Sequence, residues 1–416
     1  MDASTHRVVH AEAARDRTVC LPGSKSITHR LAILAALGEV PATVERPLVA
    51  EDTELTVAAL RTMGADAEMS AERIAVRGSI GKTRGTEIFL GNSGSSARFL
   101  LPLAGFLDRP VTFSGIPRLH ERPFAELFDA LGRLGMSVMA RDDRLPATVY
   151  PARMIGGGLS FGILPSSQIV SGLMMAATRM RAPLSMRLPE RLPSMPYVDL
   201  TLALMERLGY RLTRKGRDID IEPGGPAEPW TMAVEPDLSA ASYWVAYALI
   251  HGVSVTLPGV TLPALQGDAA IFDIARQAGA SVVATEAGLR VSGPMTRGFR
   301  VDALGTPDLV PALAVMGMFA PEPVVITGTA LLRHKESDRI AAVQENIAAL
   351  RGRSDYGDGT LTVYPQRTYR GSVLPSFNDH RIAMSFAIAG TRIPGVAIGE
   401  PGCVGKSYPG FWDDLD

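Results

Sequence analysis

A pattern that recurs along the whole chain limits the folds open to it. A small or acidic residue followed by an apolar, helix-like run occurs six times, at intervals of about 70 residues. The runs begin near Ser24, Ser93, Ser166, Ser239, Asp308 and Asp379. Between them lie amphipathic stretches such as VDLTLALMERLG, which end at a glycine and lead into short β-like segments. The pattern therefore predicts six α/β units, each with an apolar helix, an amphipathic helix and strands.

Six similar units most simply form an α/β (α+β) protein with two pseudo-symmetric domains of three units each. A propeller or a solenoid would need shorter and more uniform repeats. Residues 223–230, rich in Pro and Gly and without periodicity, predict the linker. The apolar helices are expected to be buried and the amphipathic ones to face solvent. If the buried helices run in parallel, their N-termini face an interdomain cleft that suits anions.

The composition excludes several other classes of protein. The 416 residues are 46% hydrophobic and 20% charged with a net charge of −1, so no global charge attracts nucleic acid or an anionic membrane. Cys20 and Cys403 cannot form a disulfide framework, and no Cys/His spacing predicts a metal site. The first residues lack the apolar core of a signal peptide, and no apolar stretch reaches membrane-spanning length. These features predict a soluble cytoplasmic protein.

The stretch LPGSKS, from Leu21 to Ser26, resembles part of a phosphate-binding loop of nucleotide hydrolases. That motif requires Gly directly before Lys and another Gly five residues earlier, but Ser24 precedes Lys25 and Val19 occupies the earlier position. The nucleotide interpretation therefore fails. A helix N-terminus with exposed backbone N–H groups and a neighbouring cation remains, and this arrangement suits an anion.

Polar and basic residues of a consistent kind occupy the other helix starts and three further loops. The helix starts contain GNSG (up to Gly94), SSQ (Ser166, Ser167, Gln168), Asp308 and DHR (Asp379, His380, Arg381), and the loops are PRLHERP with Arg118, RHKESDR with Lys335, Glu336 and Arg339, and GKSYPGFW with Lys406. Each has a purely structural alternative. Asp308 and Asp379 are also ordinary helix N-caps, and Arg118 with Glu121 is also a loop ion pair of little energetic value.

Taken together and in order, the motifs LPGSKSxxxR, GNSG, PRxxERP, SSQ, PD, KESDR, NDHRxAM and GKSYPxFW resemble the enolpyruvyl transferases. The resemblance extends from about Leu21 to Trp412, and it is strongest to the branch that uses shikimate 3-phosphate. It implies two domains of three βαβαββ units, with both chain ends in one domain. The expected domains are residues 1–21 with 231–416, and residues 22–230.

The resemblance also implies a reaction and a set of roles. The enolpyruvyl group of phosphoenolpyruvate passes to the 5-hydroxyl of shikimate 3-phosphate and phosphate is released, in a monomer without metal or organic cofactor that glyphosate inhibits. The implied phosphoenolpyruvate-binding residues are Lys25, Gly94, Arg118, Gln168, Arg339, Arg381 and Lys406. The implied shikimate 3-phosphate-binding residues are Lys25, Ser26, Arg30, Ser166, Ser167, Gln168, Ser194, Asp308 and Lys335. The implied catalytic residues are Asp308 as base, and Glu336 with Lys25 for the proton at the methylene carbon.

Two positions depart from the pattern that is common in this branch. Leu331 lies where some members have Asn, and Met195 where some have Lys. A specialised paralogue that acts on another phosphorylated or shikimate-like cyclic alcohol therefore stays open as an alternative. The branch that uses UDP-N-acetylglucosamine usually has a reactive Cys in the PRLHERP loop, and this loop has none.

Overall fold

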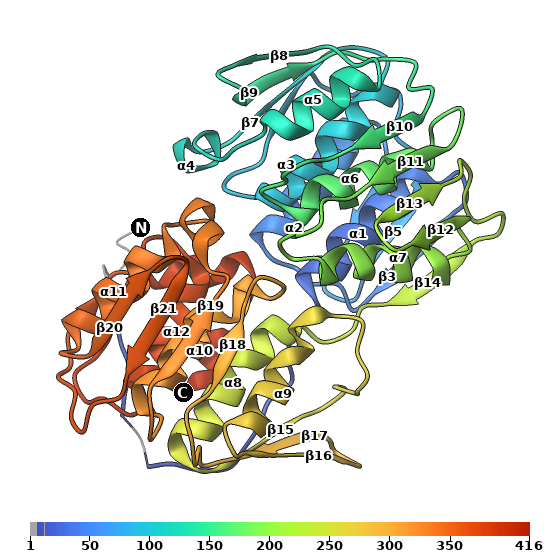
Figure 1. Ribbon diagram of the computed structural model, residues 1–416. Helices are drawn as coiled ribbons and strands as arrows, with labels where there is room; N and C mark the ends of the chain where they lie inside the picture. Colours follow the sequence, from blue (N-terminus) through green and yellow to red (C-terminus); the bar gives the residue numbers. More distant parts are fainter. Residues whose placement is uncertain (1–5, 12) are drawn as a thin grey trace. The chain divides into compact units, whose positions relative to one another are not determined.

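The computed structural model describes residues 6–11 and 13–416 (Figure 1). These residues form two compact units. The central unit is Gly23–Glu235, and the terminal unit joins the described residues up to Pro22 with Pro236–Asp416. Each unit is described by itself below.

The central unit contains three four-stranded sheets of the same topology. Counted in spatial order, the first and second strands of each sheet pair in parallel, and the second and third, like the third and fourth, pair antiparallel. The sheets are, in spatial order, β14 (Trp230–Ala233), β3 (Ala42–Glu45), β5 (Arg73–Gly78), β4 (Asp66–Met69); β6 (Glu87–Phe89), β7 (Val111–Ser114), β9 (Arg144–Val149), β8 (Val138–Arg141); and β10 (Gly157–Ser160), β11 (Leu184–Arg187), β13 (Asp218–Ile221), β12 (Leu212–Lys215).

The terminal unit repeats this topology twice and then shortens it. Its two four-stranded sheets are β2 (Arg17–Thr18), β15 (Ser254–Leu257), β17 (Gly288–Ser292), β16 (Ser281–Thr285); and β18 (Arg300–Asp302), β19 (Val324–Thr327), β21 (Thr360–Tyr364), β20 (Arg353–Gly357). Among the residues that the structure describes, the sixth sheet has three strands, β22 (Val373–Leu374), β23 (Ala397–Gly399) and β1 (His6–Val8). There β1 pairs antiparallel with β23 where the other sheets have a β-hairpin strand. The predicted fold class, with three repeats per unit, is confirmed, and the sixth repeat is abbreviated.

One strand places the boundary between the units later than the sequence pattern suggested. β14 at Trp230–Ala233 pairs in parallel with β3 at Ala42–Glu45, and so completes the first sheet of the central unit. The boundary accordingly falls between Glu235 and Pro236, rather than after residue 230. At the other crossing it falls between Pro22 and Gly23, against the predicted 21/22.

The six apolar helices are buried, as predicted. They are α1 (Lys25–Leu37), α3 (Gly94–Leu100), α6 (Ser167–Ala177), α8 (Leu238–His251), α10 (Val310–Phe319) and α12 (His380–Gly390). Every residue of α12, and all but one residue of each of the others, is buried. In Figure 1 α1, α3 and α6 run through the interior of the central unit, and α8, α10 and α12 lie within the terminal unit. A helix that is apolar on all sides can be accommodated only in a core, which explains the three sheets around each set.

The amphipathic helices bury only one face. They are α2 (Glu51–Thr62), α5 (Ala125–Arg133), α7 (Pro196–Arg207), α9 (Ala270–Gln277) and α11 (Arg339–Ala349). Four of them are followed by a glycine with positive φ, namely Gly64, Gly135, Gly209 and Gly279. The chain leaves all five helices through the same pair of backbone hydrogen bonds, as in Gly209 N to Glu206 O and Tyr210 N to Met205 O. The predicted glycine stops are confirmed.

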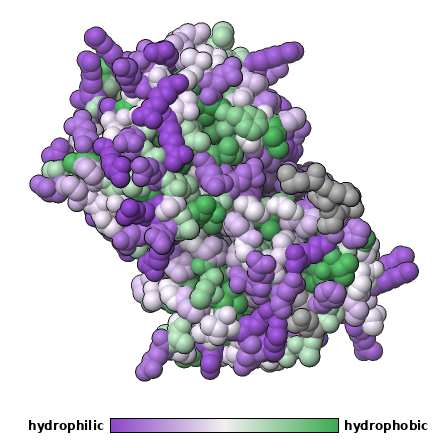
Figure 2. Space-filling model, turned by 180° about the vertical axis from the view of Figure 1, so that it is seen from behind, coloured by the Kyte–Doolittle hydropathy of each residue, from purple (hydrophilic) through white to green (hydrophobic). Residues whose placement is uncertain are grey.

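In the described part of the chain, no helix is both long and apolar enough to cross a bilayer. On the face shown in Figure 2, hydrophobic residues form separate patches among hydrophilic ones.

The fifth amphipathic helix generates a prediction about stability. Arg351, with φ of 64°, occupies after α11 the left-handed position that glycine occupies in the other four repeats. Arg351→Gly should therefore raise the free energy of unfolding by about 0.5–1 kcal/mol, because an L side chain is strained there. Chemical denaturation would measure the change.

Two matched variants separate backbone strain from side-chain contacts. Arg351→Ala removes the Arg side chain but keeps the strain, so it should give no stabilisation. Gly209→Ala should destabilise by about 1 kcal/mol from strain alone, since a Cβ at Gly209 meets nothing within 4 Å. Equal effects of Gly and Ala at position 351 would contradict the explanation.

Candidate active site

In the central unit, hydrogen bonds tie the starts of α1, α3 and α6 together. Lys25, at the start of α1, donates from Nζ to Asp52 Oδ2 at 3.1 Å. Asp52 also accepts at its carbonyl oxygen from Ser96 Oγ of α3 at 3.4 Å. The neighbouring Ser95 accepts from Gln168 Nε2 of α6 at 2.7 Å. The sequence-predicted residues of the first three repeats therefore gather at one end of their buried helices.

The start of α6 presents the SSQ motif in an ordered arrangement. Ser166 caps the helix by accepting from Gln168 N at 3.2 Å, and Ser167 is buried. The Gln168 Oε1 atom accepts from Arg98 Nη1 at 3.1 Å, so this Arg of α3 orients the amide. Ser194 lies just before α7 in the left-handed region, with φ of 57°. Strain at a non-glycine residue is a common feature of ligand-binding positions.

Arg30 is a buried cation with neutral partners. Its guanidinium donates to Thr201 Oγ1 at 2.7 Å, to the carbonyls of Ser26 and Tyr197, and to Ser171 Oγ at 3.3 Å. The residue is 2% exposed, and no carboxylate among the described residues forms an ion pair with it. Burial lowers the pKa of Arg30 from 12.5 to about 10. A desolvated guanidinium of this kind favours an anion nearby. Ser26, whose carbonyl it holds, is half-buried beside it.

Gly94 lies directly beside Arg122 of the PRLHERP loop in the central unit. A Cβ on Gly94 would lie 2.4 Å from Cζ of Arg122, a buried residue of that loop. The glycine therefore allows a guanidinium to lie against the start of α3. Arg118, the residue predicted from the motif, is on α4 (Pro117–His120) and donates to Glu121 Oε2 at 2.7 Å. Its side chain is 30% exposed, so it can exchange this surface partner for another anion.

In the terminal unit, Arg339 connects three carboxylates. Its guanidinium donates to Asp308 Oδ1 at 2.7 Å, to Glu336 Oε2 at 2.7 Å and to Asp379 Oδ2 at 2.8 Å. The Arg339 side chain is 1% exposed. Burial would lower the pKa of Arg339, but Asp379, Glu336 and Asp308 outweigh it and raise the pKa above its ordinary value. In this conformation, the Arg339 guanidinium is therefore not accessible to solvent, and it positions the two predicted proton-transfer carboxylates, Asp308 and Glu336.

Asp308 is not the helix N-cap that its sequence context also suggested. It lies in the 3₁₀ turn η3 (Pro307–Leu309), and its side chain accepts from Arg339 and, at 2.9 Å, from Arg381 Nη2. Burial would raise the pKa of Asp308, but Arg381, Lys335 and Arg339 hold it below the ordinary range. Asp379 does cap α12, by accepting from Arg381 N at 3.0 Å.

Lys335 and Lys406 complete the cation set of this unit. Lys335 follows the turn η4 (Ala330–His334) and is half-buried, and Lys406 ends the turn η5 (Pro401–Lys406) and is 5% exposed. The buried Tyr408, Phe411 and Trp412 anchor the loop of Lys406, as the sequence predicted. Glu400 links that loop to the start of α12, because it accepts from Ser376 Oγ at 3.2 Å and Asn378 N at 3.3 Å.

Several residues of these clusters were missed by sequence reasoning. They are Asp52, Arg98, Arg122, Asp268 and Glu400. Arg122 belongs to the PRLHERP motif, and a second arginine in that motif was a signal that could have identified it. Asp52, Arg98 and Glu400 act through contacts with residues distant in sequence, so no local pattern marks them.

Within the described residues, no group of three or more His, Cys, Asp or Glu side chains is arranged to hold a metal ion.

Asp268 is a buried carboxylate next to the Asp308 cluster. It lies in the turn η2 (Gly267–Ala269), is 1% exposed and accepts a hydrogen bond from Ser239 Oγ. Burial, followed by the negative charge of Asp308, raises the pKa of Asp268 from 3.8 to about 6, against the opposing influence of Arg381. Asp268 and Asp308 thus have pKa values moved in opposite directions, a feature typical of functional sites.

Comparisons with known proteins bear on the family and the fold of the chain. The profile of the EPSP synthase (3-phosphoshikimate 1-carboxyvinyltransferase) family matches residues 10–415. A 3-phosphoshikimate 1-carboxyvinyltransferase of Methanoregula boonei is 35% identical over 412 residues, which cover 97% of both chains. The chloroplastic one of Petunia hybrida is 33% identical over 96% of this chain and 82% of that protein. An EPSP synthase structure from Acinetobacter baumannii matches with a TM-score of 0.80 and 24% identity, covering 98% of this chain and 97% of that one.

The six-repeat fold and the family profile together show an α/β enzyme of the enolpyruvyl transferase class. Within that class, the chain belongs to the EPSP synthase family.

The opposite pKa shifts in the Asp308 cluster predict a pH effect. Asp268 binds its proton more tightly in the folded state, so its ionisation costs stability increasingly as the pH rises from about 4 to about 6. Asp268→Asn removes this titration. The midpoint of thermal unfolding of the Asn variant, relative to wild type, should therefore be higher at pH 7.5 than at pH 4.5.

Asp273→Asn is the matched control, since Asp273 lies on the neighbouring α9 with its side chain 73% exposed. The difference in the midpoint of thermal unfolding between Asp273→Asn and wild type should not change between pH 4.5 and pH 7.5. A pH-independent offset for Asp268→Asn would show that burial does not perturb this carboxyl.

Proposed function

We propose that the protein transfers the enolpyruvyl group of phosphoenolpyruvate to the 5-hydroxyl of shikimate 3-phosphate and releases phosphate. Family membership supports this reaction. The observation that carries the assignment of roles is the joint attachment of Asp308 and Glu336 to the Arg339 guanidinium. It holds two carboxylates of the proposed acid–base pair in one cluster, surrounded by cations.

The proposed chemistry assigns one proton to each carboxylate. Asp308 accepts the proton of the attacking hydroxyl as the new C–O bond forms at C2 of phosphoenolpyruvate. Glu336, assisted by Lys25, gives a proton to the methylene carbon and removes one again when phosphate leaves, which restores the double bond. Arg381 and Lys406 stabilise the negative charge on the departing phosphate.

The proposed binding roles are divided between the two units. In the central unit, Ser26 and Arg30 hold the carboxylate of shikimate 3-phosphate, and Ser166, Ser167 and Ser194 hold its phosphate, while Gln168 contacts the ring and, with Gly94 and Arg118, phosphoenolpyruvate. In the terminal unit, Lys335 assists the acceptor phosphate, and Arg339, Arg381 and Lys406 serve phosphoenolpyruvate. The buried charge of Arg30, without an acidic partner among the described residues, supports an anionic ligand beside it.

The proposed reaction needs only these two substrates. All residues assigned to it belong to one chain, so a monomer suffices, and we place the enzyme in the cytoplasm without nucleic-acid or membrane partners. Neither unit contains all the assigned residues, so both are required for turnover.

Isosteric changes test the proton-transfer roles. Asp308→Asn and Glu336→Gln should each lower kcat by about 10² or more, because they keep the shape but remove a proton acceptor or donor. The affinity for shikimate 3-phosphate should change little, since its phosphate and carboxylate contacts remain. Phosphate release with both substrates measures kcat, and calorimetric titration measures the affinity.

Asp338→Asn is the matched control, because Asp338 directly precedes Arg339 but caps α11 instead of joining the cluster. Asn is as good an N-cap as Asp, so kcat should be unchanged. Wild-type protein that releases no phosphate with shikimate 3-phosphate, but does so with another cyclic alcohol, would replace the proposed acceptor by that of a specialised paralogue.

Gly94→Ala tests the phosphoenolpyruvate site. The new Cβ must displace the Arg122 guanidinium, so the KM for phosphoenolpyruvate should rise about 10-fold, in proportion to the loss of roughly one charge-assisted contact. Glyphosate has one atom more than phosphoenolpyruvate between its carboxyl and phosphorus groups. Its inhibition constant should therefore rise by a larger factor than the KM, because a narrowed site excludes the longer molecule first. Inhibition kinetics competitive with phosphoenolpyruvate provide both values. Equal factors would remove the steric explanation.

A further inference from the structure

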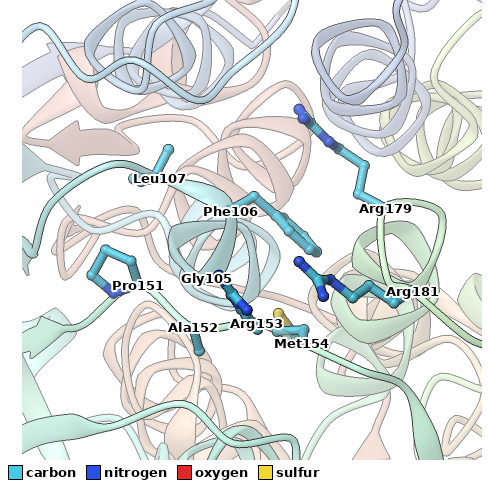
Figure 3. Close-up of a pocket in the computed structure, with 9 residues that line it drawn as sticks. All are labelled: Gly105, Phe106, Leu107, Pro151, Ala152, Arg153, Met154, Arg179 and Arg181. Carbon is cyan, nitrogen blue, oxygen red and sulfur yellow. The ribbon is translucent and has the colours of Figure 1, made fainter.

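A cavity, called the arginine pocket below, lies in the central unit at the end of the buried helices that is distant from the predicted site residues. The arginine pocket has a volume of about 420 Å³ and is lined by Gly105, Phe106, Leu107, Pro151, Ala152, Arg153, Met154, Arg179 and Arg181 (Figure 3). Arg179 and Arg181 follow the end of α6, whereas Ser166 and Gln168 occupy its start. The 11 residues of α6 span about 16 Å, so the arginine pocket is separate from the helix starts.

The walls of the arginine pocket are held together by hydrogen bonds between distant segments. Ala152 N donates to Gly105 O at 3.0 Å, and Arg181 N donates to Met154 O at 3.2 Å. These bonds join the end of η1 (Leu101–Phe106), the segment after β9 and the turn after α6. The pocket is therefore formed by the fold itself and not by a single loop.

All the charged residues that line the pocket are positive. Three arginines line it and no acidic residue does. Arg179 has a structural task, since it donates from Nη1 to Ile80 O at 2.9 Å and lies 5.8 Å from the Phe106 ring centroid. Arg153 and Arg181 are exposed, and within the described part of the chain neither side chain has a hydrogen-bond or ion-pair partner. In Figure 3 the Arg181 side chain extends toward the middle of the pocket.

Apolar groups occupy the rest of the lining. Met154 is 2% exposed and Leu107 is 6% exposed, and the Phe106 ring and Pro151 add further apolar surface. A small ring would find van der Waals contacts on these groups, while its acidic substituents would pair with Arg153 and Arg181. The volume lies in the range typical of sites for small molecules.

We propose that the arginine pocket is a non-catalytic binding site for a small ring compound that carries two negative charges. A structural role explains Arg179, which donates to the Ile80 carbonyl in the loop after β5, but it does not explain the exposed pair Arg153 and Arg181. The carboxylate of Glu39 attracts Arg179, so the uncompensated positive charge at the cavity belongs to Arg153 and Arg181, and a dianion pairs with both.

Calorimetric titration of the full chain with phenyl phosphate tests the site. Because the catalytic clusters also attract phosphate esters, wild type should show two classes of site. Arg153→Gln/Arg181→Gln should lose one class or weaken it at least 10-fold, without change in kcat. The control Arg141→Gln/Arg144→Gln removes two exposed arginines from the β8–β9 hairpin of the same unit and should bind like wild type. Lys25→Gln should still bind phenyl phosphate at the class of site that is lost in Arg153→Gln/Arg181→Gln.

Two comparisons decide the ligand class. Inorganic phosphate supplies charge without a ring and benzyl alcohol a ring without charge, so both should bind the pocket at least 10-fold more weakly than phenyl phosphate. Unchanged phenyl phosphate binding in Arg153→Gln/Arg181→Gln, or loss of all binding in Lys25→Gln, would overturn the proposal. Inorganic phosphate that binds the pocket as tightly as phenyl phosphate would overturn the requirement for a ring.

Discussion

The complete burial of three apolar helices is the constraint on which each unit depends. A helix without a polar face exposes its polar groups only at its ends, so donors and charges must collect there. Each unit surrounds its three helices with sheets. Hydrogen bonds such as Lys25–Asp52 and Gln168–Ser95 connect the helix starts of the central unit, and Asp308–Arg381 connects the starts of α10 and α12 in the terminal unit. The hydrophobic core thus determines where an anion can be bound.

The two units stabilise their charged groups in different ways. In the terminal unit, Arg339 neutralises carboxylates from three segments, and all partners of this buried network are strongly paired. In the central unit, Arg30 is buried among neutral acceptors and its pKa is lowered to about 10. The first cluster is nearly self-sufficient without substrate, whereas the second carries a desolvation cost that an anionic ligand reduces. This difference is the basis for proposing acid–base roles in the first cluster and acceptor binding in the second.

The repeats, the buried helices and the glycine stops could be predicted because each depends on a local pattern of about 10 to 15 residues. What escaped prediction depends on contacts between distant segments. The long-range pairing of β14 with β3 moved the unit boundary past Trp230. The fourth apolar helix starts at the Asp237 cap, two residues before Ser239, because a Ser inside the first turn resembles a cap in sequence. Asp308 resembled a cap for the same reason, and only the fold shows its two arginine partners.

The Asp308 cluster also links ligand binding to basicity. Arg381 makes the largest favourable contribution to the low pKa of Asp308, and it holds Oδ2 at 2.9 Å. A carboxylate this strongly ionised is a weak base, so full pairing with two arginines is unfavourable for proton abstraction. An anion that draws Arg381 away removes that attraction, and burial then raises the pKa of Asp308. If phosphoenolpyruvate is that anion, its arrival converts Asp308 from a structural ion-pair partner into a competent base only when the group to be transferred is present.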